Sequence, residues 1–443
     1  VYMVLQRTLY DKLCQWRKSG TRKSLLLQGA RQTGKSYLLE HFAKNEFENQ
    51  FLFNFEKNPG LKEIFRNDLD PQRIIRELSL AANRSINPES DIVIFDEIHE
   101  SPRAISSLKY FSEEIPELAL AGAGSLLGVK LSNESFPVGK VEFLHLYPLS
   151  FTEFLQATGD ELLLETLDVG QLQNVPAIAH NRLWHLLKEY FIAGGMPQVV
   201  EEYLQLRATP VEARRRVREL QRGLLDSYYK DFAKHSGANN AIHIVAVFEN
   251  IPMQLAGNLE GSVNRYKFKD VIAGKKGFTA LQGPIEWLIK AGLLIKVKVC
   301  NRAEIPLEAF CRPNIFKLFI FDIGLLGCLL DLPVEAILND DYGIAKGYFA
   351  ENFVAQELQT AGRRNLYSWT ERNSEIEFLI TDKDVIVPLE VKSGMRTQAK
   401  SMQQYIRRYS PSRAVILSKR NFTEKAGSCI QYLPLYMAGM IPF

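Results

Sequence analysis

One stretch decides the fold of the N-terminal region, and it reads Gly29-Ala30-Arg31-Gln32-Thr33-Gly34-Lys35-Ser36. It follows an apolar run at 25–27, which supplies the strand–loop–helix context of a phosphate-binding loop. Glycines let the backbone approach the β- and γ-phosphates, so that N–H groups and the next helix N-terminus face the negative charge. Lys35 adds a positive charge, and the Ser36 hydroxyl is placed to hold Mg²⁺. The pattern predicts that residues 29–36 bind ATP with Mg²⁺.

An acidic pair closes a second apolar run. Residues 91–97 read Asp-Ile-Val-Ile-Phe-Asp-Glu, the pattern of a strand buried on both faces that ends in two acids. We expect Asp96 to hold the magnesium ion through its water shell, and Glu97 to polarise the water that attacks the γ-phosphate. A further strand near 118–121 runs towards Ser125, which we expect to sense the γ-phosphate from the neighbouring strand. These motifs predict a P-loop ATPase domain built on a parallel sheet.

Length and composition set the broad class. A chain of 443 residues with 46% hydrophobic content suggests about two to four globular domains. No apolar stretch reaches membrane-spanning length, and the first 16 residues lack a signal-peptide core, so we expect a cytoplasmic protein without a membrane segment. The five cysteines are scattered without metal-ligand spacing, which predicts reduced thiols.

The net charge of +3 conceals a strong segregation of charge. Nine basic and two acidic residues lie between 261 and 302, a balance of +7, and nine basic and one acidic lie between 392 and 425, a balance of +8. The rest of the chain therefore carries −12. Two basic segments on an otherwise acidic protein indicate a polyanion partner, for which we predict DNA. Solvated lysine-rich faces are the alternative interpretation.

The first basic segment has the order of a winged helix. Helical stretches at 241–256, 268–272 and 279–291 precede a strand that starts at 295 and carries alternating lysines. In such a domain the third helix would enter the major groove, and Lys296, Lys298 and Arg302 would lie along phosphates. The third helix also has a strongly apolar face, which favours a winged helix used only for packing or protein contact almost as much.

A hairpin precedes the second basic segment. Strands at 374–380 and 386–392 flank a polar turn, which would set Glu377 opposite Glu390, with Lys392 on the same face as Glu390. Two carboxylates beside a lysine can hold Mg²⁺ while the lysine orients or deprotonates an attacking water. Salt-bridged strands give the same pattern, so this alternative stays open.

A longer series of motifs points to one known family. In chain order the motifs are GARQTGKS (29–36), FDEIHE (95–100), GSLL (124–127), YPLSFTEF (147–154), GGMP (194–197), FDIGLL (321–326), ENFV (351–354), EIEF (375–378) and LEVK (389–392). Together they resemble the prokaryotic AAA-like ATPases whose C-terminal region is a domain of unknown function. The resemblance covers nearly the whole chain.

The resemblance implies a P-loop domain, a winged-helix middle and a C-terminal fold similar to the PD-(D/E)xK nucleases. It adds Glu351 to Glu377, Glu390 and Lys392 as a catalytic set, with Glu377 and Glu390 as metal ligands. The sequence departs from the family at two positions. Glu377 stands where the motif usually has Asp, and Lys140 stands where Arg is common, so the bidentate fork of an arginine finger is missing.

We expect an ATPase domain at 1–156, a helical connector at 157–239, a winged helix at 240–310 and a restriction-endonuclease-like α/β domain at 311–443. The predicted function is ATP hydrolysis by a protein that acts on DNA, with the nucleotide state controlling a C-terminal half that binds DNA and cleaves it if the carboxylate site is active. The competing hypothesis is a signalling or scaffold ATPase whose nuclease-like domain has lost its chemistry and binds a protein partner.

Overall fold

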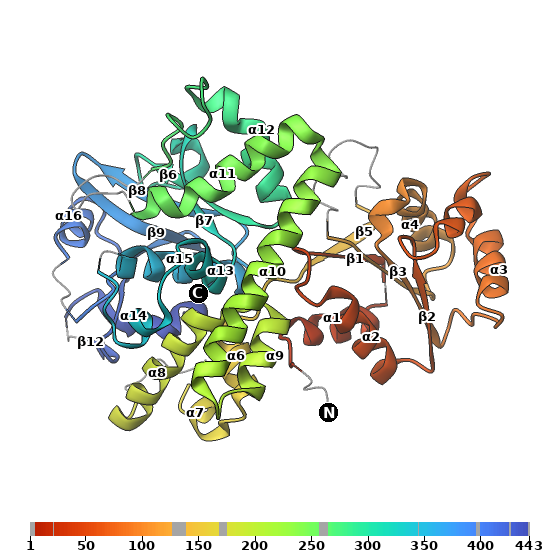
Figure 1. The fold of residues 1–443 in the computed structure, drawn as a ribbon, viewed down its shortest axis with the longest axis horizontal. Coiled ribbons are helices and arrows are strands. Elements are labelled where there is room, and N and C mark those ends of the chain that lie inside the picture. Colours follow the sequence, from red (N-terminus) through yellow and green to blue (C-terminus); the bar gives the residue numbers. More distant parts are fainter. Residues whose placement is uncertain are drawn as a thin grey trace. The chain divides into compact units, whose positions relative to one another are not determined.

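The computed structural model describes residues 5–20, 22–125, 139–167, 175–256, 265–343, 345–395, 399–424 and 427–441. The chain divides into two compact units (Figure 1). The N-terminal unit covers 4–147 together with 290–292, and the C-terminal unit covers the remainder. In the described part of the chain, each helix is too short or too polar to cross a membrane.

The N-terminal unit is built on a five-stranded, wholly parallel sheet with the order β2-β3-β4-β1-β5. Its strands are β1 (Ser24–Gln28), β2 (Asn49–Asn54), β3 (Asp91–Asp96), β4 (Ala119–Ala123) and β5 (Val141–His145). Its helices are α1 (Leu9–Lys18), α2 (Lys35–Glu46), α3 (Pro71–Ala81) and α4 (Pro102–Glu114), with short 3₁₀ turns at Pro59–Phe65 and Ile98–Glu100. The predicted parallel α/β domain is confirmed.

Strand β3 shows why this sheet needs helices on both faces. Ile92 and Ile94 belong to a core with α1 and α2, whereas Val93 and Phe95 belong to a second core with α3 and α4. Because successive side chains of a strand point to opposite faces, a run that is apolar at every position needs cover on both sides. The apolar run that ends at Asp96 is therefore a central strand.

The C-terminal unit combines a helical layer with a second sheet. Its helices are α6 (Phe151–Thr158), α7 (Glu161–Glu165), α8 (Ala177–Ala193), α9 (Pro197–Gln205), α10 (Pro210–Ser236), α11 (Ala238–Ala256), α12 (Phe278–Lys290), α13 (Ile323–Leu329), α14 (Val334–Leu338), α15 (Ala345–Thr360) and α16 (Lys400–Tyr409). A 3₁₀ turn at Leu307–Phe310 precedes β7, and another at Leu435–Met440 follows β13.

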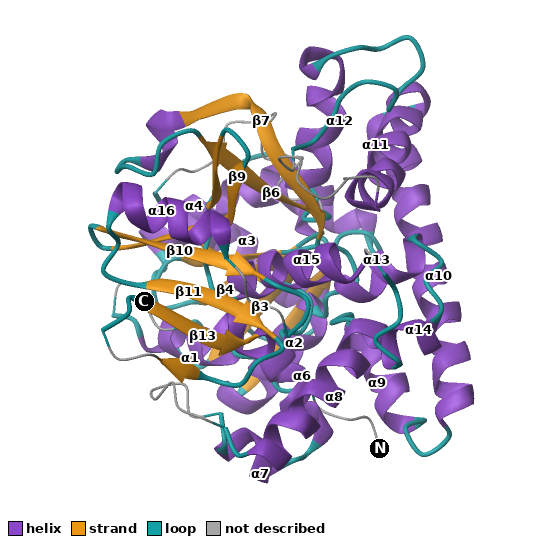
Figure 2. Ribbon diagram, turned by 90° about the vertical axis from the view of Figure 1, so that its left-hand side faces the viewer, coloured by secondary structure: helices purple, strands orange, loops and turns teal. Residues whose placement is uncertain are grey.

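The second sheet has eight strands in the order β12-β13-β11-β10-β9-β8-β6-β7 (Figure 2). The strands are β6 (Leu294–Cys300), β7 (Cys311–Ile320), β8 (Leu366–Glu371), β9 (Ser374–Asp382), β10 (Val385–Val391), β11 (Ala414–Ser418), β12 (Thr423–Glu424) and β13 (Ile430–Pro434). The sheet is mixed, since β6 pairs with β8 in parallel and β10 pairs with β11 in parallel, while the hairpins are antiparallel.

The hairpin β6–β7 differs from the predicted wing. Its strand β6 also pairs with β8, with Val297 opposite Leu366, so the predicted division at residue 310 falls inside one continuous sheet. The apolar face of α12 is buried, including Ile285 and Trp287. Local sequence pattern cannot reveal this arrangement, because β6 gains its second partner from a strand about seventy residues later in the chain.

The segment at the end of the predicted ATPase domain packs with the C-terminal unit. The units divide after Tyr147, and α6 packs in the C-terminal unit, where Phe151 and Phe154 lie 5.7 and 5.4 Å from the Tyr190 ring. The backbone N–H of Phe151 donates to a carboxylate oxygen of Glu357 at 3.0 Å. Aromatic packing and this hydrogen bond therefore assign 148–156 to the second unit.

Candidate functional site

The loop between β1 and α2 adopts a conformation that requires its glycines. Gly34 has φ +92°, and a Cβ at Gly29 would overlap the carbonyl oxygen of Leu146. Gln32 also has a positive φ of 65°. Left-handed residues alternating with right-handed ones turn successive N–H groups to the same side, which makes an anion-binding concavity ahead of the α2 N-terminus.

Lys35 is buried at the start of α2. Its Nζ donates to the carbonyl oxygens of Gly29 and Ala30 at 3.0 and 2.7 Å. Burial lowers the pKa of Lys35 to about 8, although the charges of Glu97 and Asp96 oppose the shift. The ammonium group is therefore held by the loop and has one remaining donor for a phosphate oxygen.

Asp96 is fixed by two side chains. The Ser36 hydroxyl donates to its Oδ1 at 2.7 Å, and the Asn54 amide donates to its Oδ2 at 2.7 Å. Asn54 was not predicted, although it ends the strand beside β3 and lies in register with Asp96. The Ser36 hydroxyl and the Asp96 carboxylate are adjacent hard oxygen donors, and they fit a magnesium ion that keeps most of its water shell.

Glu97 follows β3 in a left-handed conformation, with φ 48°. Its Oε2 lies 3.1 Å from His99 Nδ1. Burial would raise the pKa of Glu97, but the hydrogen bond and charge of His99, with the charges of Lys35 and Arg31, lower it below the ordinary value. Glu97 is thus ionised at neutral pH and able to orient a water molecule. His99 was missed as an orienting residue, although it stands in the FDEIHE motif.

Two other predicted positions are less constrained by the geometry. Ser125 lies just beyond β4, the strand that pairs with β1 through Ala123 and Leu27. Its role as a sensor of the γ-phosphate stays a prediction. The last two residues of the GSLL motif lie outside the described residues. Lys140 forms an ion pair with Glu113 at 3.1 Å, which places its charge within its own unit.

In the C-terminal unit, the structure brings together the four residues of the predicted carboxylate set. The hairpin register sets Ile386 opposite Thr381, as the turn predicted. Lys392 Nζ lies 2.7 Å from an oxygen of Glu390, and the N–H of Val391 donates to Glu377 at 3.1 Å.

The shared environment of these groups appears in their pKa values. Burial is the main cause that raises the pKa of Glu377 to about 8, and the negative charges of Glu351 and Glu390 add to it against the positive charge of Lys392. Burial likewise raises the pKa of Glu351. Glu377 is therefore largely protonated at neutral pH.

Sequence reasoning missed the centre of this cluster, Lys317 on β7. Only 4% of its side chain is exposed, its Nζ lies 3.5 Å from Glu351, and it forms a second ion pair with Glu375. Burial would lower the pKa of Lys317, but Glu375, Glu351 and Glu377 together raise it above the ordinary value. In the sequence, the signal for this site was a single lysine within the apolar half of a strand.

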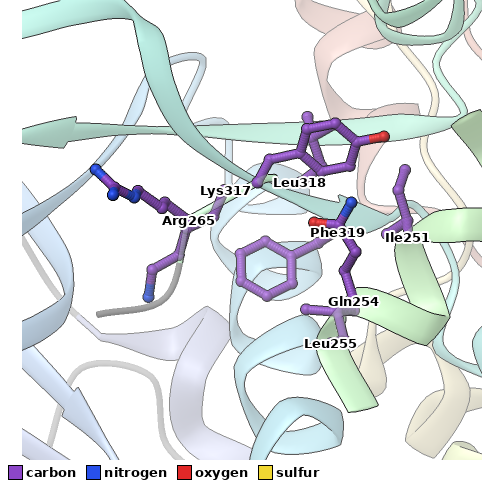
Figure 3. Close-up of a pocket in the computed structure, with 8 residues that line it drawn as sticks. Ile251, Gln254, Leu255, Arg265, Lys317, Leu318 and Phe319 are labelled. Atoms are coloured by element: carbon purple, nitrogen blue, oxygen red, sulfur yellow. The ribbon is translucent and has the colours of Figure 1, made fainter. Parts of the chain in front are cut away.

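Side chains of β7 and β9 meet although the two strands are not neighbours in the sheet. The rings of Phe319 and Phe378, one from each strand, lie 6.2 Å apart, although β6 and β8 stand between the two strands in the sheet order. A small cavity of about 20 Å³ lies beside Lys317 and Arg265 (Figure 3). That volume holds about one water molecule.

The cluster does not fit a metal ion. Within the described ranges, no group of three or more His, Cys, Asp or Glu side chains is arranged to hold one. Lys317 engages Glu351 and Glu375, which leaves Glu377 and Glu390 as the remaining carboxylates. The metal site at Glu377 and Glu390 therefore stays a prediction, and the ammonium group of Lys317 supplies positive charge to the neighbouring carboxylates Glu351 and Glu375.

The predicted nucleic-acid residues differ in their environments. Lys296 pairs with Glu286 at 3.0 Å, and Lys298 pairs with Glu308 at 2.7 Å. Arg302 is exposed over the Phe310 ring. Two of the three cations are thus already neutralised by carboxylates of the same chain.

Three family comparisons cover separate parts of the chain. Residues 21–155 match the AAA domain family. Residues 185–336 match a domain of unknown function (DUF8612), and residues 346–438 match a domain of unknown function (DUF4143). No curated protein matches the sequence.

Several solved structures show a distant similarity. The Walker-type ATPase PABY2304 of Pyrococcus abyssi has 18% identity and a TM-score of 0.46, covering 74% of this chain and 96% of that one. The Aeropyrum pernix Orc1 protein in complex with DNA has 15% identity and a TM-score of 0.31, covering 76% and 92%. The Thermotoga maritima RuvB Holliday junction branch migration motor has 14% identity and a TM-score of 0.32, covering 68% and 90%.

The family match coincides with the phosphate loop, the buried strand β3 and the acidic pair Asp96 and Glu97. The loop geometry, the contact between Ser36 and Asp96, and the ionised Glu97 supply the groups that ATP hydrolysis needs. The chain is therefore an AAA-type P-loop ATPase, with its nucleotide site inside the matched residues 21–155.

Proposed function

We propose that the chain uses ATP hydrolysis to act on DNA, which its C-terminal unit binds without cleaving. The observation that carries this proposal is the exposed face of α16. This helix contains two arginines and one lysine but no acidic residue. The proposal also keeps the nuclease-like fold implied by the motif series, in a form whose carboxylates serve structure.

The basic face of α16 consists of Lys400, Gln403 and Arg407, which are all exposed. Their spacing places them on one side of the helix, while Met402 and Tyr405 are buried on the other. Among the residues that the structure describes, none forms an ion pair with Lys400 or Arg407. Cations without carboxylate partners remain available to displace counterions from phosphates, unlike Lys296 and Lys298.

The ion pairs of Lys317 support the proposal that the C-terminal unit does not cleave DNA. A nuclease of this type needs a divalent cation to stabilise the charge that develops on the scissile phosphate. Here the ammonium group of Lys317 is bound between Glu351 and Glu375, and Glu377 is largely protonated at neutral pH. Both features lower the negative charge that would attract a metal ion. The cluster therefore stabilises the fold.

Replacing Lys400 and Arg407 by glutamine is expected to weaken DNA binding in a salt-dependent way. Each phosphate contact contributes about −0.9 to the slope of log affinity against log salt, so the slope should become shallower by about 2. A gel-shift or anisotropy titration with duplex DNA at several salt concentrations measures this slope. DNA should stimulate ATP turnover by the wild type but not by this double variant.

The matched control is Arg215→Gln with Lys230→Gln, which removes two exposed charges from α10 and should leave the slope unchanged. Equal slopes in both double variants would contradict the role of α16. A wild type that binds no DNA at low salt would instead support the scaffold ATPase with a protein partner. Nicking that needs Mg²⁺ and disappears in Glu390→Ala would show that the C-terminal unit does cleave DNA.

Nucleotide affinity is expected to fall as the pH rises above about 8. The pKa of Lys35 is lowered to about 8 in the free protein, and bound phosphates would raise it, so binding takes up a proton above this pH. Affinity should then decrease by up to about tenfold per pH unit. Calorimetric titration between pH 7 and 10 checks this. In Lys35→Arg the pH dependence should vanish, because arginine stays protonated, and a steep decline in that variant would exclude Lys35 as its cause.

A further inference from the structure

Two cysteines meet at the outer end of the β6–β7 hairpin. Cys300 ends β6, Cys311 begins β7, and the two residues are cross-strand partners. Their sulfur atoms lie 2.8 Å apart, and each also lies within 3.5 Å of the Leu307 carbonyl oxygen. The intervening ten residues return the chain to the same place, so the hairpin itself holds the two thiols together.

The two thiols have different environments. Cys300 is fully buried, whereas Cys311 is partly exposed. The hydrogen bond from the Cys300 thiol is the main cause that lowers the pKa of Cys311, against the opposing effect of burial. The negative charge of Glu308 raises this pKa, and the positive charge of its ion-pair partner Lys298 lowers it. Cys311 is therefore the accessible nucleophile, since the thiolate is the reactive form, and Cys300 lies behind it.

We infer that Cys300 and Cys311 form an oxidation site that closes to a reversible disulfide in the presence of a low-molecular-weight disulfide. The motif series and the family comparisons assign no role to either residue. The sulfurs are already in contact, and adjacent antiparallel strands bring opposite Cα atoms within the range that a disulfide spans. The site takes a small disulfide such as oxidised glutathione, which can reach Cys311 from solvent.

The reaction proceeds in two balanced exchange steps. The Cys311 thiolate attacks one sulfur of glutathione disulfide, which forms a mixed disulfide and releases one glutathione thiolate. The Cys300 thiol then loses its proton and attacks the Cys311 sulfur, which releases the second glutathione. The two protein thiols are oxidised, and the glutathione disulfide is reduced to two thiols. The product ties residues 301–310 into a closed loop that contains Arg302 and Glu308.

The test exposes the full chain to oxidised glutathione and then counts free thiols. We expect the five thiols to fall to three, with a peptide cross-link between Cys300 and Cys311 and full recovery after treatment with dithiothreitol. A folded wild type that keeps all five thiols, or that forms a cross-link to another cysteine, would overturn the inference.

Single variants separate the two roles. Cys300→Ser should accumulate a glutathione adduct on Cys311, because the resolving thiol is missing. Cys311→Ser should gain neither adduct nor cross-link. Cys429→Ser, which changes a partly exposed cysteine elsewhere in the unit, should cross-link as the wild type does. If Cys300→Ser gains no adduct while its circular dichroism matches the wild type, Cys311 is not the nucleophile and the proposed site is wrong.

Discussion

Glu97→Gln is expected to slow ATP hydrolysis by about 10²- to 10⁴-fold, the usual contribution of a general base. The glutamine keeps the shape of the side chain but cannot accept a proton from the attacking water. Its contact with His99, 3.1 Å away in the wild type, can persist. Nucleotide affinity should stay close to that of the wild type, because Glu97 acts on the water and makes no phosphate contact.

Lys35→Ala is the paired variant, and it should abolish nucleotide binding. Lys35 Nζ is held by the loop carbonyl groups and supplies the charge that faces the phosphates. Fluorescent-nucleotide binding and steady-state turnover, measured on both variants, separate the two roles. Equal loss of binding in both variants would contradict the assignment of Glu97 as the group that acts on water.

Lys317→Met is expected to lower the free energy of unfolding of the C-terminal unit by about 3–5 kcal/mol, the cost of leaving buried charges without a partner. The methionine fills a similar volume, so the loss would report the missing charge opposite Glu351 and Glu375. Urea unfolding followed by tryptophan fluorescence measures it, because Trp184, Trp287 and Trp369 all lie in this unit.

Neutralising one of the two carboxylates that lack a counter-charge should restore part of the lost free energy of unfolding. The double variant Lys317→Met with Glu375→Gln is expected to be more stable than Lys317→Met alone, since only Glu351 then lacks its counter-charge. Lys276→Met, at an exposed lysine of the same unit, controls for the change of residue type and should stay within about 0.5 kcal/mol of the wild type. A comparably small effect of Lys317→Met would show that Lys317 does not neutralise the cluster.

Local pattern was sufficient for the nucleotide site. The loop at 29–36 and the strand before Asp96 each depend on neighbours in the sequence, namely glycines where the backbone turns and apolar residues where both faces are covered. The register of the β9–β10 hairpin was predictable for the same reason, because a tight turn determines which residues face each other. Asn54 ends the strand beside β3, and His99 lies within the FDEIHE motif.

The sequence by itself therefore predicted the parallel α/β domain, the phosphate loop with the adjacent Asp96, and the closeness of Glu377 and Glu390. Only the tertiary structure decided what surrounds them. Lys317 on β7 contacts Glu351 of α15 and Glu375 of β9, although β7 and β9 are not neighbours in the sheet, and Lys298 pairs with Glu308. Such charge pairs depend on which strands become neighbours, and strand order is set by packing of the whole unit rather than by adjacent residues. For that reason, the sequence predicted the lysine-rich hairpin and the carboxylate pair as motifs. It did not predict Glu308 and Lys317, the residues that pair with them or with their neighbours.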